Sequence, residues 1–262
     1  MQIYFNGLIF ILMLGIIPWI YTLYEKKVCI VDSLWSLAFI VLGFFYFYHL
    51  SFDSSNFFGQ VSDVNKLLLI LLLLWGLRLS LHITYKNWGK PEDARYQAIR
   101  ANNEPYFSIK SIYIVFGLQG FLAWVISAPI FFTLLENDIS FNWIHYVAIA
   151  IFTLGFTFES VGDWQLLNFK KDKSNAGLVL NSGLWYYTRH PNYFGDCCVW
   201  WSFYLFALAA SHPMTLFSPL LMTLLLLKVS GVSLQEKTIA DRRPEYRAYQ
   251  VSTNAFFPGP KK

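Results

Sequence analysis

Charged side chains are scarce in this chain: Asp, Glu, Lys and Arg make up 14% of its 262 residues, compared with about 25% in a soluble domain. Hydrophobic residues account for 56% and aromatic residues for 19%. The apolar residues form long runs instead of the spaced patterns that line one face of a soluble helix or strand. This composition excludes an ordinary soluble domain and predicts an all-α, polytopic membrane protein.

Cysteine is scarce as well, and the chain contains only Cys29, Cys197 and Cys198. Adjacent cysteines are poorly placed to bridge each other, and no Cys or His pair has the spacing of a zinc site. The pattern excludes a disulfide framework and predicts no metal site. It favours thiols that pack as small hydrophobic groups.

Three catalytic signatures are missing from the sequence. Gly-x-Gly-x-x-Gly between a strand and a helix, Gly-x-Ser-x-Gly and His-Glu-x-x-His do not occur. Their absence excludes a nucleotide site on a Rossmann fold, a hydrolase with a nucleophile elbow and a zinc protease.

The long hydrophobic runs number seven. About 20 residues cross the hydrocarbon core of a bilayer, so the first five runs qualify, and the shorter last two are expected to form a tight pair. With no linker or repeat between them, we expect one membrane-embedded domain over residues 1–262 and about seven transmembrane helices. The predicted spans are Ile3–Tyr24, Val28–Leu50, Leu67–Leu81, Ser111–Leu135, Trp143–Val161, Cys197–Ala210 and Met214–Ser230.

The basic residues predict the orientation. Most of the 20 Lys and Arg lie at Lys26 and Lys27, in 82–111, in 162–195 and from Lys228 onward. The positive-inside rule then places the N-terminus outside and the C-terminus in the cytoplasm. The net charge of +4 therefore indicates membrane lipids as partners and no nucleic acid. A bacterial inner membrane is the simplest location.

A dense polar cluster follows the fifth run. Arg189, His190, Asn192 and Asp196 lie within eight consecutive positions. Pro191 disfavours a helical conformation at the preceding residue, so we expect a helix that begins near Asn192 and presents its free N–H groups to a phosphate or carboxylate. Arg189 adds a fork-shaped donor suited to phosphate. Alternatively, Asn192 and Asp196 cap the helix and Arg189 anchors a lipid headgroup.

Two further segments carry polar side chains near the predicted spans. Glu159 and Asp163 are one helical turn apart and share a face, which either contacts a ligand or forms a structural network. The segment Asn87–Tyr96 is either a solvated loop or a source of a proton donor, Tyr96, because a phenol can polarise a carbonyl without being charged.

The C-terminal region from Ser230 to Tyr249 is the last polar segment. Glu236 is expected to pair with a basic partner or with a ribose hydroxyl. Leu234, Lys237 and Asp241 fit a short helix that leaves the membrane, with Arg242, Arg243 and Arg247 at headgroup level. The segment is either a membrane-surface anchor or one wall of a site.

These motifs occur in one order along the chain. Thr188-Arg-His-Pro-Asn-Tyr-Phe-Gly-Asp196 follows Glu159-x-x-x-Asp163-x-Gln165 and precedes Glu236, Pro244, Tyr246, Tyr249 and Phe257-Pro258. Asp32-Ser-x-Trp35, Glu92-Asp-x-Arg-Tyr96 and Ser230-Gly-Val232 complete the set. The combination, over roughly residues 30–260, resembles the steroid 5-alpha-reductase C-terminal domain superfamily, and most closely its largely uncharacterised bacterial branch. The motif Arg-His-Pro-x-Tyr alone is shared with the isoprenylcysteine carboxyl methyltransferases.

The resemblance implies a seven-helix membrane enzyme that binds NADPH on the cytoplasmic side and reduces an activated carbon–carbon double bond. The Gln-Glu pair with which the steroid enzymes orient the substrate ketone is absent, Glu159 replaces their Asn and Glu236 replaces an aromatic residue, so steroid specificity is not implied. The candidate cofactor-binding residues, from the residues themselves and from the resemblance, are Asn87, Lys90, Glu159, Asp163, Lys170, Arg189, His190, Asn192, Tyr193, Asp196 and Glu236.

Three functions remain open at this point. The first is NADPH-dependent reduction of a lipid-like substrate (a steroid, isoprenoid or fatty enone), with Tyr96 or Tyr193 as proton donor. The second is methyl transfer from S-adenosylmethionine to a lipid or a prenylated thiol. The third is lipid binding without catalysis.

Overall fold

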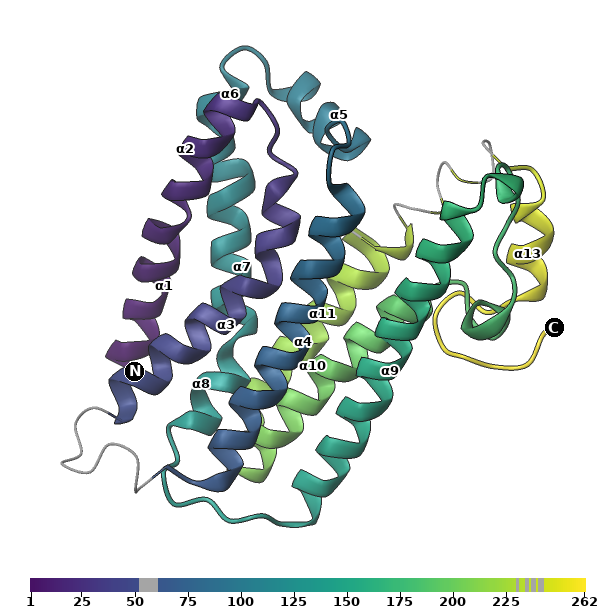
Figure 1. Cartoon of the computed structure of the whole chain (residues 1–262). Coiled ribbons are helices and arrows are strands. Elements are labelled where there is room, and N and C mark those ends of the chain that lie inside the picture. Colours follow the sequence, from purple (N-terminus) through teal and green to yellow (C-terminus); the bar gives the residue numbers. More distant parts are fainter. Residues whose placement is uncertain (52–60, 230, 234–235, 237–238, 240–242) are drawn as a thin grey trace. The chain divides into compact units, whose positions relative to one another are not determined.

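A computed structural model of the chain describes residues 1–51, 61–229, 231–233, 236, 239 and 243–262. All regular secondary structure in these residues is helical, as predicted. The residues pack into two units, Met1–Ser140 and Phe141–Lys262. Figure 1 shows the helices of the chain.

Five helical segments of the described residues are long and apolar enough to cross a membrane, which confirms the first five predicted spans in outline. The sixth predicted span lies in α10 (Pro191–Ala209), which is not among the five, and the seventh lies in the shorter apolar helix Pro213–Val229. Polar side chains in the first turns of α10 account for its lower hydropathy. The five segments are Gln2–Glu25, Ile30–Ser51, Asp63–Asn87, Phe107–Ile126 and Trp143–Lys171.

Unit 1 is built around the packing of two of these spans, α3 (Ile30–Ser51) and α4 (Asp63–Asn87). A Cβ atom at Gly76 would lie 2.7 Å from Ile40, so the two helices approach closely here. The hydroxyl of Ser36 donates to the Gly76 carbonyl at 2.7 Å. Small residues and interhelical hydroxyl bonds of this kind hold membrane helices together where the hydrophobic effect is weak.

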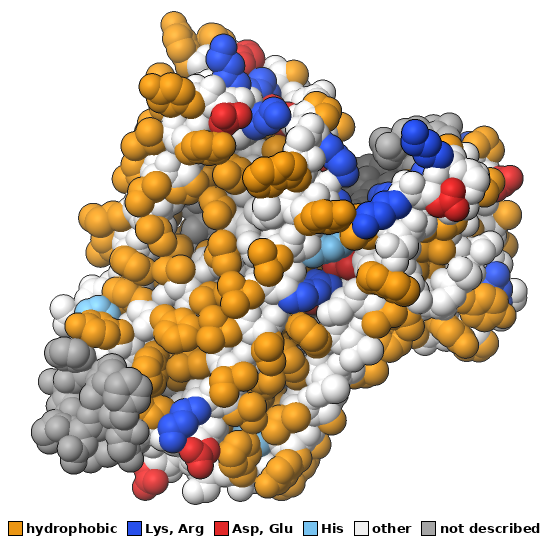
Figure 2. All heavy atoms as spheres, viewed as in Figure 1, with side chains coloured by type: hydrophobic (Ala, Val, Ile, Leu, Met, Phe, Trp, Pro, Cys, Tyr) orange, Lys and Arg blue, Asp and Glu red, His pale blue; other side chains and the backbone are white. Residues whose placement is uncertain are grey.

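The remaining helices of unit 1 pack against this pair or against one another. The first span is a continuous run of α1 and α2, and α1 packs on α3 and α7 (Figure 1). Figure 2 shows hydrophobic side chains over the outward faces of these helices, as expected for surfaces that meet lipid. The bounds are α1 Gln2–Leu14, α2 Ile16–Glu25, α5 Ala94–Asn103, α6 Phe107–Ser111, the π-helix η1 Ile112–Gly117, α7 Leu118–Ile126 and α8 Ala128–Leu134.

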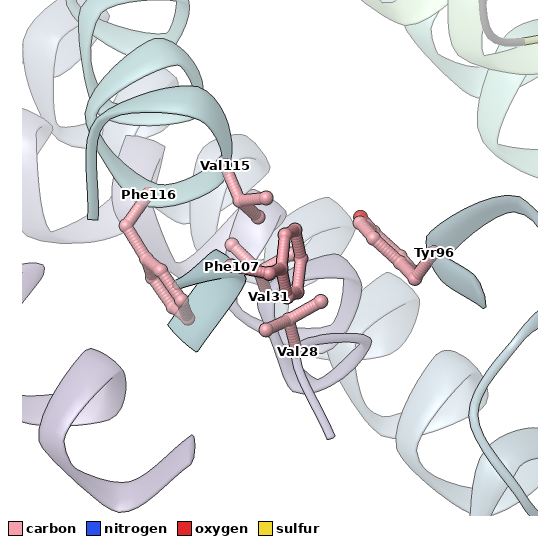
Figure 3. Packing of buried hydrophobic residues seen from close by; sticks show 6 residues of the cluster. All are labelled: Val28, Val31, Tyr96, Phe107, Val115 and Phe116. Carbon is pink, nitrogen blue, oxygen red and sulfur yellow. The ribbon is translucent and has the colours of Figure 1, made fainter. Parts of the chain in front are cut away.

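Helix α5 is held by an aromatic and aliphatic cluster at one end of unit 1. Figure 3 shows Tyr96 of α5 pointing toward Val31 and Phe107, with Val28, Val115 and Phe116 beside them. At the edge of the cluster, the guanidinium of Arg100 forms an ion pair with Glu92 at 3.1 Å and lies 4.5 Å from the Phe107 ring centroid. Tyr96 is therefore buried within unit 1, whereas residues 88–91 of the connection after α4 are exposed, as the loop interpretation expects.

Unit 2 is built on α9 (Trp143–Lys171) and α10, which run side by side (Figure 1). A Cβ atom at Gly155 would lie 2.6 Å from the Gly195 carbonyl oxygen, and one at Gly162 would lie 3.1 Å from Pro191. The glycines therefore bring the two backbones into contact near the start of α10.

The remaining elements of unit 2 are short. Figure 1 shows α13 (Tyr246–Ser252) beside the end of α9, close to the segment that leads into α10. The other short elements of unit 2 are η2 Lys173–Asn175, η3 Gly183–Tyr186, η4 Pro213–Leu216, α11 Phe217–Leu224 and the π-helix η5 Leu225–Val229.

The helix that the sequence predicts after the last span depends partly on residues that lie outside the described ones. These are Ser230, Leu234, Lys237, Asp241 and Arg242.

The three thiols are free, as predicted. Cys197 is buried, whereas Cys29 and Cys198 are partly exposed, so only Cys197 fits the expectation of a fully packed thiol.

Candidate functional site

The start of α10 has the geometry that the sequence predicts. His190 has φ −138° and ψ 62°, outside the helical region, and Pro191 is the first residue of the helix. Its N-cap makes no side-chain hydrogen bond. Gly183, with φ +61°, begins η3, and Trp185 of that turn donates from Nε1 to the Gly162 carbonyl at 3.0 Å. These contacts fasten the chain before α10 to α9.

Asn192 joins the two helices through a carboxylate. Its Nδ2 donates to Oδ1 of Asp163 at 3.1 Å, and Asp163 is 7% exposed. The other end of the amide, Oδ1, is buried and accepts no hydrogen bond from any residue that the structure describes. A buried acceptor without a donor is costly, so this oxygen is suited to a ligand that brings an N–H or O–H group.

Arg189 uses its guanidinium inside the protein. Nε and Nη2 donate to the two carboxylate oxygens of Glu236 at 2.7 and 3.0 Å. Nη1 donates to the carbonyls of Gln250 at 2.8 Å and Thr253 at 2.6 Å. This geometry assigns Arg189 to the architecture of the site, and its contact with a phosphate stays a prediction.

Glu236 is the centre of a network. Besides Arg189, its carboxylate lies 3.0 Å from Nε2 of His190 and accepts from the Tyr246 hydroxyl and the Gln250 amide, each at 3.3 Å. Burial would raise the pKa of this carboxyl group, but the hydrogen bonds from His190 and Arg189 and the charge of Arg189 outweigh it and lower the pKa to about 2. Of the two partners expected from the sequence, the structure provides the basic one.

The same carboxylate affects its neighbours. Burial lowers the pKa of the Arg189 guanidinium. The hydrogen bond to Glu236 and the charge of Glu236 outweigh burial, so the pKa is raised. Burial and the charge of Glu236 both raise the pKa of Tyr246. The network is therefore a fixed negative charge surrounded by permanent donors.

The C-terminal tail covers the segment that precedes α10. The Thr188 hydroxyl donates to the Phe256 carbonyl at 2.9 Å, and the Arg189 amide donates to the Asn254 carbonyl at 2.9 Å. The Gly259 amide donates to the Tyr187 carbonyl at 3.0 Å. The tail thus provides backbone partners for the Arg189 amide and the Tyr187 carbonyl, in the segment between η3 and α10.

A second polar cluster lies in unit 1. The hydroxyl of Tyr96 donates to Oδ1 of Asp32 at 2.6 Å, and Arg95 donates to Oδ2 at 2.6 Å. The Gln119 amide donates to the Tyr96 oxygen at 3.3 Å. Burial and the charge of Asp32 raise the pKa of Tyr96, so this phenol stays protonated. The carboxylate of Asp32 therefore pairs with Arg95 and Tyr96.

The remaining predicted residues lie in or near these elements. Glu159 is 2% exposed on α9, where Gly195 packs against its backbone, and Asp196 is 8% exposed on α10. The Tyr193 ring lies parallel to His190, with centroids 5.6 Å apart. Lys170 belongs to the last turn of α9. In unit 1, Asn87 ends α4 and its carbonyl accepts from the Lys90 amide at 3.1 Å.

Several residues that the sequence reasoning missed hold the site together. Gln250, Thr253 and Trp185 contact Arg189 or α9, and Gln119 contacts Tyr96. Gln250 and Thr253 contribute backbone carbonyls to Arg189, and a carbonyl contact leaves no residue-specific trace in a sequence. Gln119 is an amide inside an apolar span, which was an available signal.

The chain is similar to proteins whose function is not described. A family model described as a protein of unknown function (DUF1295) matches residues 18–253. The uncharacterized protein C594.04c of Schizosaccharomyces pombe is 25% identical over 281 residues, which cover 96% of this chain and 78% of that protein. No solved structure matches the chain. The matched range includes the Glu236 network, the Asn192–Asp163 pair and the Asp32–Tyr96 pair.

Proposed function

The chain belongs to the DUF1295 family of proteins of unknown function, and we propose that it is a membrane-embedded, NADPH-dependent reductase of an activated carbon–carbon double bond in a lipid-like substrate. The observation that carries this proposal is the buried Oδ1 of Asn192 beside Asp163 at the start of α10. The resemblance of residues 188–196 and their neighbours to the steroid 5-alpha-reductase superfamily supports the choice of cofactor.

The residues near α10 fit a dinucleotide in a specific way. A dinucleotide carries ribose hydroxyls and a carboxamide, which are donors, and phosphates, which need donors. Asn192 Oδ1 is an acceptor for a ribose hydroxyl or for the carboxamide. The uncapped N-terminus of α10 and Lys170 are donors for the phosphates. When bound, NADPH supplies the hydride.

Tyr96 is the proposed proton donor. Its pKa is raised, so the hydroxyl retains its proton at neutral pH, and a substrate carbonyl would compete with Asp32 for that hydrogen bond. Stabilising the negative charge that develops on the carbonyl oxygen is the main contribution expected of such a donor. Tyr193 is the second candidate.

We propose a single domain of seven spans, with α10 and Pro213–Val229 as the last two, the N-terminus outside and the cofactor site on the cytoplasmic side. A bacterial inner membrane remains the proposed location.

Ligand-dependent thermal unfolding of the purified protein tests the function. Saturable stabilisation by NADPH, with none by S-adenosylmethionine, is expected, because a ligand that binds the folded state raises the melting temperature. The variants N192A and D163A are expected to weaken NADPH binding by about tenfold, corresponding to roughly one hydrogen bond. E245Q, which changes an exposed glutamate of the same unit, is the matched control. Stabilisation by S-adenosylmethionine alone would favour the methyltransferase, and stabilisation by neither would overturn the proposal.

A further inference from the structure

His190 is a buried imidazole whose orientation is fixed from two sides. The residue is 3% exposed. Its ring lies nearly parallel to Tyr193, at an angle of 16° and a centroid distance of 5.6 Å. On its edge, Nε2 lies 3.0 Å from Oε1 of Glu236. The ring therefore cannot turn without losing either the stacking or the hydrogen bond.

The partner of Nε2 determines which nitrogen carries the proton. Glu236 receives two donors from Arg189 and one each from Tyr246 and Gln250. A carboxylate with this many donors is ionised and can only accept. The contact with Nε2 is a hydrogen bond only if Nε2 carries hydrogen, so in the neutral imidazole Nδ1 holds a lone pair. No residue that the structure describes hydrogen-bonds to Nδ1 of His190.

A second acceptor lies two residues further along the chain. The buried Oδ1 of Asn192 accepts from no described residue, because the Nδ2 end of that amide is directed to Asp163. Asp163 thus fixes the direction of the amide as Glu236 fixes the tautomer of the imidazole. Two carboxylates on other segments thus orient two neighbouring side chains: the amide of Asn192 presents an acceptor, and so does the imidazole of His190 in its neutral form.

We propose that Nδ1 of His190 accepts a hydrogen bond from an O–H or N–H group of the dinucleotide, with Glu236 as the positioning residue that sets the tautomer. The inference rests on the proposed function, and it names the chemistry that this part of the site recognises. The donor is a ribose hydroxyl or the carboxamide of the nicotinamide. Carboxylate–imidazole pairs orient the imidazole in many metal and catalytic sites by the same physics.

Nitrogen NMR of the protein labelled in its histidines tests the tautomer without any ligand. The chain has five histidines, and the variant H190F identifies the His190 signals. We expect hydrogen on Nε2 of His190 and none on Nδ1. E236Q is expected to produce a mixture of tautomers, and E245Q is expected to leave the spectrum unchanged. Hydrogen on Nδ1 of the unmodified protein would overturn the proposal, whether or not E236Q folds.

Titration with NADPH then tests the contact with the ligand. The Nδ1 resonance is expected to shift on binding. H190F, which retains an aromatic ring against Tyr193, is expected to raise the Kd for NADPH by about tenfold. The 3-acetylpyridine analogue of the cofactor lacks the amide donor: a lost shift identifies the carboxamide, and a retained shift identifies a ribose hydroxyl.

The two proposals fail in different ways. If NADPH stabilises the protein but leaves the Nδ1 resonance and the H190F affinity unchanged, the contact is wrong and the cofactor assignment stands. If NADPH does not bind, the proposed function is wrong, and the contact with the dinucleotide falls with it even where the Nε2–H tautomer is observed.

Discussion

At the residue scale, one carboxylate organises unit 2. Glu236 accepts hydrogen bonds from four side chains that come from two segments, residues 189–190 and 246–250. Its side chain is 16% exposed, so its charge is only partly screened. Breaking such a pair leaves the Arg189 charge without its partner, which costs more than the pair itself contributes.

The first prediction concerns acid. The pKa of Glu236 falls from 4.5 to about 2 on folding, so folding favours the ionised form. The stabilisation is complete above pH about 4.5 and is lost as the pH falls toward about 2. Thermal unfolding in detergent across this window measures it, and E236Q is expected to flatten the dependence. If the E236Q curve parallels that of the unmodified protein, the linkage is wrong.

The second prediction concerns the same variant at neutral pH. E236Q is expected to lower the free energy of unfolding by about 1–3 kcal/mol, because charged hydrogen bonds to Arg189 are lost and solvent screens part of the effect. E245Q, which removes an equal charge at an exposed position, is expected to change it by less than about 0.5 kcal/mol. Denaturant unfolding provides the comparison.

The third prediction concerns Tyr96 in unit 1. Y96F keeps the ring packed against Val31 and Phe107 but removes the 2.6 Å bond to Asp32. The expected loss of stability is about 1–3 kcal/mol, since the acceptor is charged and partly buried. Y106F changes an exposed phenol and is the control. Equal melting temperatures for the two variants would contradict this role of the hydroxyl.

At the element scale, the contact of α9 with α10 depends on missing side chains. Gly155 and Gly162 are seven residues apart and share a face of α9, and Gly195 lies opposite Gly155. This contact brings Asp163 to Asn192. Close backbone packing therefore sets the geometry of the polar site. A bulkier residue at one of these glycines is expected to disturb both the packing of α9 on α10 and the contact of Asp163 with Asn192.

The fourth prediction is that G155A destabilises the protein by about 1–3 kcal/mol, because the new methyl group meets backbone atoms that cannot move aside. G120A is the control, because its Cβ would meet the ends of two side chains, Leu12 at 3.2 Å and Ile11 at 3.9 Å, and no backbone atom is among these contacts. Thermal unfolding measures both. A G155A protein as stable as G120A would show that the helices separate easily.

The fifth prediction concerns the C-terminal tail. A chain that ends at Thr253 loses the carbonyls and amide that bond to residues 187–189. Hydrogen exchange is expected to accelerate at the Arg189 amide while α9 stays protected, because the opening is local. A chain that lacks only Lys261 and Lys262 is the control. Uniform acceleration along unit 2 would instead indicate global loss of structure.

At the scale of the whole molecule, five membrane-length apolar segments follow from hydropathy alone. The sequence also predicted a helix that begins near Asn192, where α10 begins at Pro191, and a basic partner for Glu236. Each of these depends on local properties: the length of an apolar run, the steric effect of proline on the preceding residue and the sign of a charge. Such properties act without knowledge of the rest of the chain.

The tertiary structure decided what the polar residues do. Arg189 and Glu236 are 47 positions apart, and Asp32 and Tyr96 are 64 apart, so no local pattern specifies these pairs. The sequence offered Arg189 as a phosphate ligand, whereas folding brings Glu236 and two tail carbonyls to its donors. Composition and periodicity determine that the chain forms apolar helices of membrane length. Which polar groups meet, and which acceptors are left for a ligand, is decided by long-range packing, because a hydrogen bond depends on distances that only the folded chain sets.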